Sequence, residues 1–188
     1  MGGSFNPPHA GHRRIAETAL GRLRLDRLWV LVSPGNPLKS HDELADFAHR
    51  LAATRAVMAH PRIVVSGLEA ALGTRYTVDT LVLLRRRFPD VRFVWVMGAD
   101  SLASLHRWKQ WRRIAELVAI AVIDRPGWRL AALASPAARA LARHRLDERH
   151  AGRLPAMRPP AWTLLSTRLS PLSSTELRRA AAVGKRRA

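Results

Sequence analysis

The sequence predicts an α/β fold, a doubly wound, Rossmann-like parallel sheet, and three observations support this. Short apolar runs alternate with amphipathic stretches along the chain. The apolar runs are continuous rather than alternating, which is typical of strands buried on both faces of a parallel sheet. A glycine-rich turn leads directly into the first helical stretch, as in many phosphate-binding α/β folds. Alternating strands and helices favour right-handed parallel crossovers, and the chain length indicates a single domain over residues 1–188.

Each element is predicted from its local pattern of apolar residues and from the residues that end it. Apolar runs predict strands at residues 28–32, 63–65, 91–97, 119–123 and 162–165. Helical spacing predicts helices at residues 13–23, 44–60, 77–88, 130–145 and 175–183, with a further helical stretch ahead of residue 119. Pro61 ends the second helix. Ligands of such sheets bind beyond the carboxyl ends of the strands, so the segments that follow the strands are expected to share one crevice.

The composition limits the class of protein. The chain contains 32 Lys and Arg but 14 Asp and Glu, which gives a formal net charge of +18. Such a surface can hold nucleic acid through phosphates alone. We attribute the charge to arginine-rich composition and expect no specific nucleic acid partner. No apolar run near 18 residues occurs and no signal peptide is visible, so we expect no membrane association. The lack of cysteine fits a cytoplasmic protein.

The opening segment, Gly-Gly-Ser-Phe-Asn-Pro-Pro-His-Ala-Gly-His at residues 2–12, is the most informative part of the chain. Its glycines permit a tight turn close to a ligand, and its prolines stiffen the approach to a helix. His9 and His12 are three residues apart, so one helical turn places both rings on one face. Free N–H groups at a helix start suit a phosphate, and two imidazoles add donors there. A metal-binding pair is the alternative, but no third ligand lies nearby in the sequence.

This segment resembles the H-x-G-H signature of the nucleotidylyltransferase superfamily, and its fuller form is most similar to the bacterial nicotinate-nucleotide adenylyltransferase family. A second segment, Leu-Ser-Ser-Thr-Glu-Leu-Arg at residues 172–178, resembles that family's I-S-S-T-x-[IL]-R motif. On local evidence alone it fits a capping box, with Ser173 and Glu176 at the start of a helix. The two motifs stand at opposite ends of the chain, so the resemblance spans nearly all of it.

The resemblance implies a set of ATP-binding and catalytic residues. It assigns His9 and His12 to catalysis at the α-phosphate. Family motifs assign ATP binding to Gly3, Ser4, Phe5, Gly98, Asp100, Ser173, Ser174, Thr175 and Arg178. Asp100 also fits a plain helix N-cap after a strand, and this alternative stays open.

A second set is implied for the pyridine nucleotide. The substrate-binding residues carried over are Asn6, Lys39, Thr77, Trp108, Lys109 and Arg125. An indole such as Trp108 can stack on a pyridine ring. Lys109 stands where the family more commonly has Tyr, whereas Trp111 is expected to pack in the core.

The activity implied is transfer of the adenylyl group of ATP to nicotinate mononucleotide, which gives deamido-NAD and pyrophosphate. Attack on the α-phosphorus would be direct and in line, and Mg²⁺ would be carried by ATP and pyrophosphate rather than by a protein metal site. A homo-oligomer is a further expectation. The alternatives are another H-x-G-H enzyme, similar to pantetheine-phosphate adenylyltransferases or cytidylyltransferases, and a non-catalytic nucleotide- or RNA-binding protein.

One expectation concerns the start of the sheet. In the related family an apolar strand precedes the glycine turn, whereas only Met1 precedes it here. Leaving that strand out would open a gap between neighbouring strands and leave backbone groups unpaired. We therefore expect the sheet to lack its first strand, with the native start upstream of Met1 or the chain trimmed.

Overall fold

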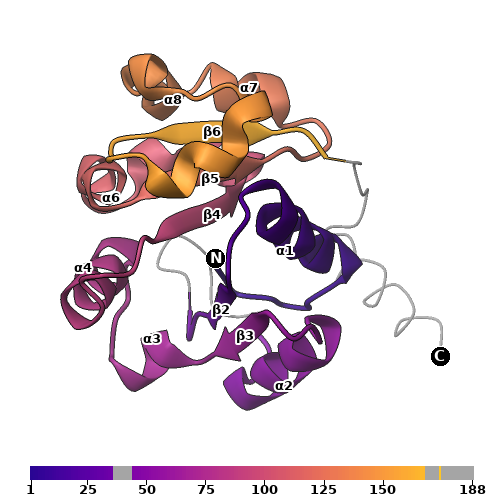
Figure 1. Ribbon diagram of the computed structural model, residues 1–188. Coiled ribbons are helices and arrows are strands. Elements are labelled where there is room, and N and C mark those ends of the chain that lie inside the picture. Colours follow the sequence, from indigo (N-terminus) through magenta and orange to yellow (C-terminus); the bar gives the residue numbers. More distant parts are fainter. Residues whose placement is uncertain (36–43, 168–173, 175–188) are drawn as a thin grey trace.

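The computed structural model describes residues 1–35, 44–167 and 174 of the chain (Figure 1). The strands are β1 (Gly2–Gly3), β2 (Leu28–Val32), β3 (Ile63–Ser66), β4 (Val94–Gly98), β5 (Ala119–Ile123) and β6 (Trp162–Leu165). The α-helices are α1 (Ala10–Arg22), α2 (Phe47–Val57), α3 (Leu68–Ala71), α4 (Thr77–Arg87), α5 (Ala99–Ser104), α6 (Trp111–Leu117), α7 (Arg129–Leu133) and α8 (Pro136–Ala140). Short 3₁₀ helices are η1 (Leu105–Arg107), η2 (Ala142–His144) and η3 (Glu148–Ala156).

All pairings between these strands are parallel, but they form two hydrogen-bonded ladders rather than one. The first has the order β1-β2-β3 and the second the order β4-β5-β6. In Figure 1, β2 and β3 lie with α2 and α3, while β4, β5 and β6 lie with α6, α7 and α8. The break falls between β1 and β4. Only Gly2 and Gly3 form β1, which pairs with the last two residues of β2.

Successive residues of the central strands point to opposite faces and enter two different cores. Leu31 of β2, Trp95 of β4 and Val122 of β5 belong to one core, which includes side chains of α4 and α6. Val30, Val96 and other alternate residues belong to the second core, under α1. Each core draws on both ladders, so the two ladders form one layer with helices packed on both faces. The predicted doubly wound architecture is confirmed, and a gap in its hydrogen bonding lies at its middle.

Most predicted elements are found, but several bounds differ. The helix predicted at 44–60 is the shorter α2 (Phe47–Val57), which ends before Pro61. The strands at 28–32, 119–123 and 162–165 are confirmed, and β4 begins at Val94 rather than at residue 91. The single helix predicted at 130–145 is wrong. Ser135 ends the first piece and caps α8, with Pro136 at the first turn, so the segment becomes α7, α8 and η2. The helix predicted at 175–183 lies outside the described residues.

Within the described ranges, no helix is long and apolar enough to cross a membrane.

Candidate active site

The two histidines of the opening motif form the start of α1. His9 is the N-cap residue, and its Nδ1 accepts a hydrogen bond from the backbone N–H of Gly11 at 3.1 Å. The backbone N–H of His9 donates in return to Nδ1 of His12 at 3.3 Å. The two rings lie against each other with centroids 3.9 Å apart and planes tilted by 39°. The predicted shared face is therefore present, in the form of a capping box built from two imidazoles.

This arrangement fixes the protonation state of the pair. Each Nδ1 accepts a backbone N–H, so the hydrogen-bond pattern assigns the remaining ring proton to Nε2. Burial, followed by the charge of Arg125, lowers the pKa of His9 below its ordinary value. Burial, with smaller contributions from His9 and Arg125, lowers the pKa of His12 to about 3. Both rings are neutral donors at neutral pH, and Nε2 of His9 is buried without a hydrogen-bond partner.

A second cluster follows β4 and β5. Nη1 of Arg125 donates to Oδ2 of Asp100 at 2.9 Å, and the pair is partly buried. A side chain on Gly98 would collide with the carboxylate of Asp100 and would meet Cδ of Arg125 at 2.9 Å, so glycine is required at this position. Oδ1 of Asp100 is buried without a partner. Three predicted site residues therefore meet, and the ion pair between two of them was not foreseen. Asp100 is not the N-cap of α5, because Gly98 takes that position.

Ser174 of the second motif contacts the opening motif. Oγ of Ser174 donates to the backbone carbonyl of Pro7 at 2.9 Å, across 167 positions of sequence. The hydroxyls of Thr18 in α1 and Thr167, the last described residue before Ser174, lie 3.2 Å apart. The other ATP-binding residues predicted in this motif lie outside the described residues: Ser173, Thr175 and Arg178. Lys39, which follows β2 in the sequence, also lies outside them.

The residues predicted for the pyridine ring gather at the start of α4. Thr77 is the first residue of α4, and no side chain caps this end of the helix. Nζ of Lys109 lies 4.4 Å from the ring centre of Tyr76 and 3.3 Å from Oδ2 of Asp79. Trp108, next to Lys109, is partly buried against the core, whereas Trp111 is buried within it, as expected.

The glycine turn itself is held by a residue that the sequence analysis did not single out. Arg50 of α2 is 1% exposed, and its guanidinium donates to four backbone carbonyls. The acceptors are Ser4 and Ser33 at 2.8 Å, Pro34 at 3.1 Å and Ala45 at 2.8 Å. Arg50 thereby joins the turn after β1 to the loop after β2. In sequence it looks like any helical arginine, so no local signal could have revealed it.

The remaining predicted residues belong to the turn. Gly3 ends β1, and its carbonyl accepts the N–H of Ser33 at 2.9 Å. Phe5 is 2% exposed with φ at 46°, and its ring lies 5.0 Å from that of His12. Its side chain therefore packs beneath the histidines, leaving only its backbone for a ligand. Oδ1 of Asn6 accepts the N–H of Ala45 at 3.3 Å.

Together these groups offer hydrogen-bond donors and positive charge of the kind that suits an anion. The turn follows β1, Gly98 ends β4 and Arg125 follows β5, so all lie beyond the carboxyl ends of parallel strands. Neutral imidazole N–H groups, a guanidinium and the start of α1 suit phosphate oxygens. In the part of the chain that the structure describes, no three His, Asp or Glu side chains are grouped to hold a metal ion.

Comparisons with known proteins show the family of the chain. Residues 1–180 match the family model described as Cytidylyltransferase-like. A protein of Brucella suis biovar 1 (strain 1330), named "Probable nicotinate-nucleotide adenylyltransferase", is 56% identical over 179 residues, which are 95% of this chain and 92% of that one. A protein of the same name from Bradyrhizobium sp. (strain BTAi1 / ATCC BAA-1182) is 57% identical over 178 residues, or 95% of this chain and 93% of that one.

The fold has a solved counterpart. Plasmodium falciparum nicotinic acid mononucleotide adenylyltransferase, solved in complex with NaAD, superimposes with a TM-score of 0.69 at 20% identity, covering 95% of this chain and 80% of that one. At this identity the likeness concerns the fold. The matches to relatives span nearly the whole chain, and the family model matched at residues 1–180 includes the histidine turn. The chain belongs to the nicotinate-nucleotide adenylyltransferase family within the Cytidylyltransferase-like proteins.

Proposed function

We propose that this protein transfers the adenylyl group of ATP to nicotinate mononucleotide, releasing pyrophosphate and deamido-NAD. One observation carries the proposal. His9 and His12 are locked as neutral rings whose Nδ1 atoms are occupied by backbone N–H groups, so each has an Nε2–H to offer a phosphate. Relatives at 56% and 57% identity bear the name of this activity.

The chemistry requires positioning and charge stabilisation but no nucleophilic side chain. A phosphate oxygen of nicotinate mononucleotide attacks the α-phosphorus in line, and the bond from that phosphorus to the oxygen bridging to the β-phosphate breaks. Pyrophosphate leaves with the electron pair. The attacking phosphate monoester is ionised at neutral pH, since its second pKa is near 6, so no general base is needed.

The roles of the described residues follow from this reaction. Nε2–H groups of His9 and His12 donate to the α-phosphate as negative charge develops there. Arg125 supplies the positive charge, and Asp100, whose Oδ1 has no partner, accepts from the nucleoside. Ser174 anchors the second motif against Pro7. The motif residues beyond Ser174 keep the roles that the family resemblance implies.

Mg²⁺ belongs to the substrate in this proposal. No protein metal cluster is found among residues 1–35, 44–167 and 174, and the triphosphate offers the oxygen ligands that Mg²⁺ prefers. When bound, Mg²⁺ neutralises the charge of the leaving pyrophosphate.

The pyridine half binds at the start of α4. Thr77 and the uncapped N–H groups of this helix provide donors for the ring carboxylate, and the Trp108 indole provides a surface for stacking. Lys109 adds a positive charge beside them.

The test is pyrophosphate release from ATP and Mg²⁺ with nicotinate mononucleotide, nicotinamide mononucleotide or phosphopantetheine as acceptor. Release dominated by the nicotinate substrate supports the proposal. Release with phosphopantetheine would retain the reaction type and overturn the substrate. No release from folded protein that still binds ATP would indicate a nucleotide-binding protein instead.

A further inference from the structure

A bridge of charged and hydroxyl side chains joins the ends of β5 and β6, beside the turn that carries Arg125. It consists of Asp124, Arg129, Ser166 and Glu148, which we call the exit bridge. Nη1 of Arg129 donates to Oδ2 of Asp124 at 2.8 Å and to Oγ of Ser166 at 3.0 Å. Oγ of Ser166 donates in turn to Oε1 of Glu148 at 3.0 Å. The exit bridge therefore connects the segment after β5 with the segment after β6.

The charged neighbours of Ser166 fix the direction of its hydroxyl. A guanidinium can only donate and an ionised carboxylate can only accept, so the hydroxyl accepts from Arg129 and directs its proton to Glu148. The backbone N–H of Ser166 donates to the other carboxylate oxygen of Glu148, Oε2, at 2.8 Å. Mainly through this N–H, the pKa of Glu148 is held below its ordinary value, so the carboxylate is ionised at neutral pH. Both oxygens of one carboxylate therefore hold a single residue at the end of β6.

Both ends of the exit bridge are held by further contacts. Nη2 of Arg22, the last residue of α1, donates to the backbone carbonyl of Glu148 at 3.2 Å. At the other end, Oδ1 of Asp124 accepts the backbone N–H of Arg125 at 2.9 Å, and the side chain of Asp124 is only 10% exposed. Nη1 of Arg125 then donates to Asp100 at 2.9 Å. The contacts therefore run from the end of the helix that the histidines begin to the ion pair of the candidate site.

Ser166 also lies just ahead of the second motif in the chain. The hydroxyl of its neighbour Thr167 lies 3.2 Å from that of Thr18 in α1. Within the motif, Oγ of Ser174 donates to the carbonyl of Pro7 at 2.9 Å. The chain is therefore held by hydrogen bonds both before the second motif and within it.

We propose that Ser166 is a positioning residue for the ATP half of the site, because it ties the end of β6, through Arg129 and Glu148, to the Arg125 turn and to α1. The inference rests on the proposed function, in which the second motif contacts ATP. A segment that is already held before a ligand binds loses less conformational freedom on binding, so the affinity is higher. Loss of the tie therefore weakens ATP binding and leaves the pyridine half, at the start of α4, unchanged.

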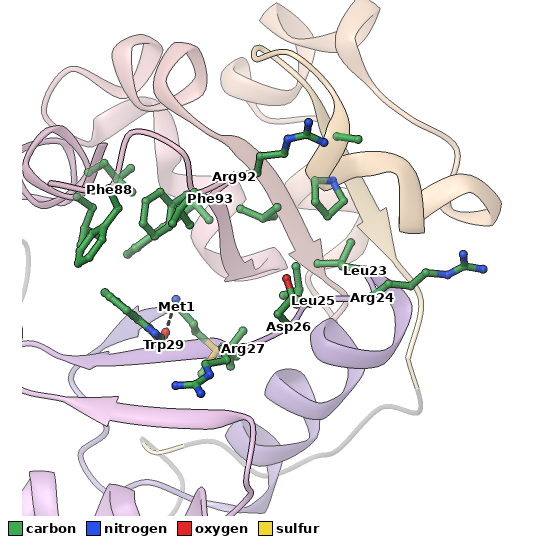
Figure 2. Close-up of a pocket in the computed structure, with 18 of the residues that line it drawn as sticks. Met1, Leu23, Arg24, Leu25, Asp26, Arg27, Trp29, Phe88, Arg92 and Phe93 are labelled. Carbon is green, nitrogen blue, oxygen red and sulfur yellow. Dashed lines mark hydrogen bonds between the residues drawn. The ribbon is translucent and has the colours of Figure 1, made fainter. Parts of the chain in front are cut away.

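The exit bridge is separate from a large cavity of the molecule. The cavity has a volume of about 740 Å³, and its lining includes residues of β2, β4 and α4, with Met1 beside Trp29 (Figure 2). The four residues of the exit bridge are not among those that line it. Substitutions in the exit bridge therefore leave the walls of the cavity unchanged.

Calorimetric binding of ATP with Mg²⁺, and separately of nicotinate mononucleotide, to the full chain tests the proposal. We expect Ser166→Ala to raise the Kd for ATP by about 3–10-fold. The Kd for nicotinate mononucleotide should not change, because the pair of Asp124 and Arg129 still holds the Arg125 turn. Ser166→Thr keeps the hydroxyl and is expected to bind ATP as the wild type does. Arg129→Met removes the donor and is expected to weaken ATP binding at least as much as Ser166→Ala.

Thr163→Val is the matched control, because Thr163 lies in the same strand and its hydroxyl donates to the carbonyl of Leu146 at 2.9 Å. Thr163 is fully buried, so loss of this bond is expected to lower the thermal midpoint, whereas the Kd for ATP should stay at the wild-type value. An unchanged Kd for ATP in Ser166→Ala would overturn the proposal. Equal increases in Ser166→Ala and Thr163→Val, or equal weakening of both ligands in Ser166→Ala, would also overturn it, since Ser166 would then only support β6.

The same measurements distinguish this inference from the proposed function. Wild-type protein that binds ATP but releases no pyrophosphate with nicotinate mononucleotide would overturn the proposed function alone, because the affinities for ATP would still compare the variants. Wild-type protein that does not bind ATP would overturn both.

Discussion

At the scale of single residues, His9 performs two tasks with two different atoms. Its Nδ1 caps α1 through Gly11, and its Nε2 is the unpartnered donor that we assign to the phosphate. Asn can perform the first task, because its side-chain oxygen caps helices well. It cannot perform the second, because it has no group at the Nε2 position. We therefore expect His9→Asn to lower kcat by about 10²–10³-fold, with an unchanged thermal midpoint. Steady-state pyrophosphate release and calorimetry measure the two quantities.

The matched control is His9→Ala, which removes both tasks. It is expected to lose the same activity and, in addition, about 1 kcal/mol of stability through the missing cap. If His9→Asn retained wild-type kcat, the ring would be a capping residue and the assignment of His9 to catalysis would fail.

Lys109 is one residue at which the sequence differs from the family pattern that the resemblance implies for the pyridine site. Its ammonium group packs on Tyr76 and pairs with Asp79, so it is held beside the start of α4. We expect Lys109→Met to raise KM for nicotinate mononucleotide by about 3–10-fold with little change in kcat, because the group binds substrate and transition state alike. KM for nicotinamide mononucleotide, which lacks the carboxylate, should not change.

Arg113→Met is the control for this substitution, since Arg113 lies on α6 and, among the described residues, pairs with its near neighbour Glu116 at 3.3 Å. Equal losses with both mononucleotides after Lys109→Met would show a structural role rather than recognition of the carboxylate.

At the scale of elements, Arg50 connects loop segments that lie apart in the sequence. Its four bonds go to carbonyls of the turn after β1, the loop after β2 and the start of α2. Arg50→Met would keep the buried stem and leave these carbonyls without a donor. We expect a loss of about 2–4 kcal/mol in the free energy of unfolding, measured by urea denaturation, and a lower kcat because the histidine turn is no longer held.

Arg55→Met tests the same change on the exposed side of the same helix. It is expected to alter stability by no more than about 0.5 kcal/mol. Similar losses for the two variants would mean that α2 needs arginine for a reason other than the carbonyl contacts.

The elements also show what local pattern can and cannot predict. The runs at 28–32, 119–123 and 162–165 are apolar throughout and were located to the residue, because strands buried on both faces have no polar positions. Alanine-rich composition predicts a helix over 130–145, but Ser135 caps a new helix, α8, which begins at Pro136. Arg50 could not be found at all, since its partners are backbone carbonyls up to 46 positions away.

At the scale of the whole molecule, the topology explains why the predicted site residues meet. Parallel strands place the turn after β1, Gly98 and Arg125 at one edge, so the crevice was predictable from the alternation of strands and helices. The gap between the two ladders is likewise an expectation of the sequence. The ion pair between Asp100 and Arg125 was not predictable, because it depends on the distance between two segments, to which sequence patterns are insensitive.

The stability of the whole molecule should depend on pH through His12. Burial lowers its pKa to about 3 in the fold, from an ordinary value of 6.5. Above pH 6.5 the ring is neutral in both folded and unfolded chains, so the contribution of His12 to the free energy of unfolding is constant. As pH falls from 6.5 toward 3, only the unfolded chain takes up the proton, so the free energy of unfolding decreases by at most about 1.4 kcal/mol per pH unit.

His12→Asn removes this proton and keeps an acceptor for the N–H of His9. We expect the wild type to lose up to about 2 kcal/mol more than His12→Asn between pH 7 and pH 5, as measured by urea denaturation at both values. Other titrating groups, such as Glu69, whose pKa is raised by burial, are common to both proteins and cancel in the comparison. Parallel losses would mean that His12 is protonated as readily in the fold as outside it. In that case the neutral donor assigned to the α-phosphate would be an imidazolium, and transfer would depend on its positive charge.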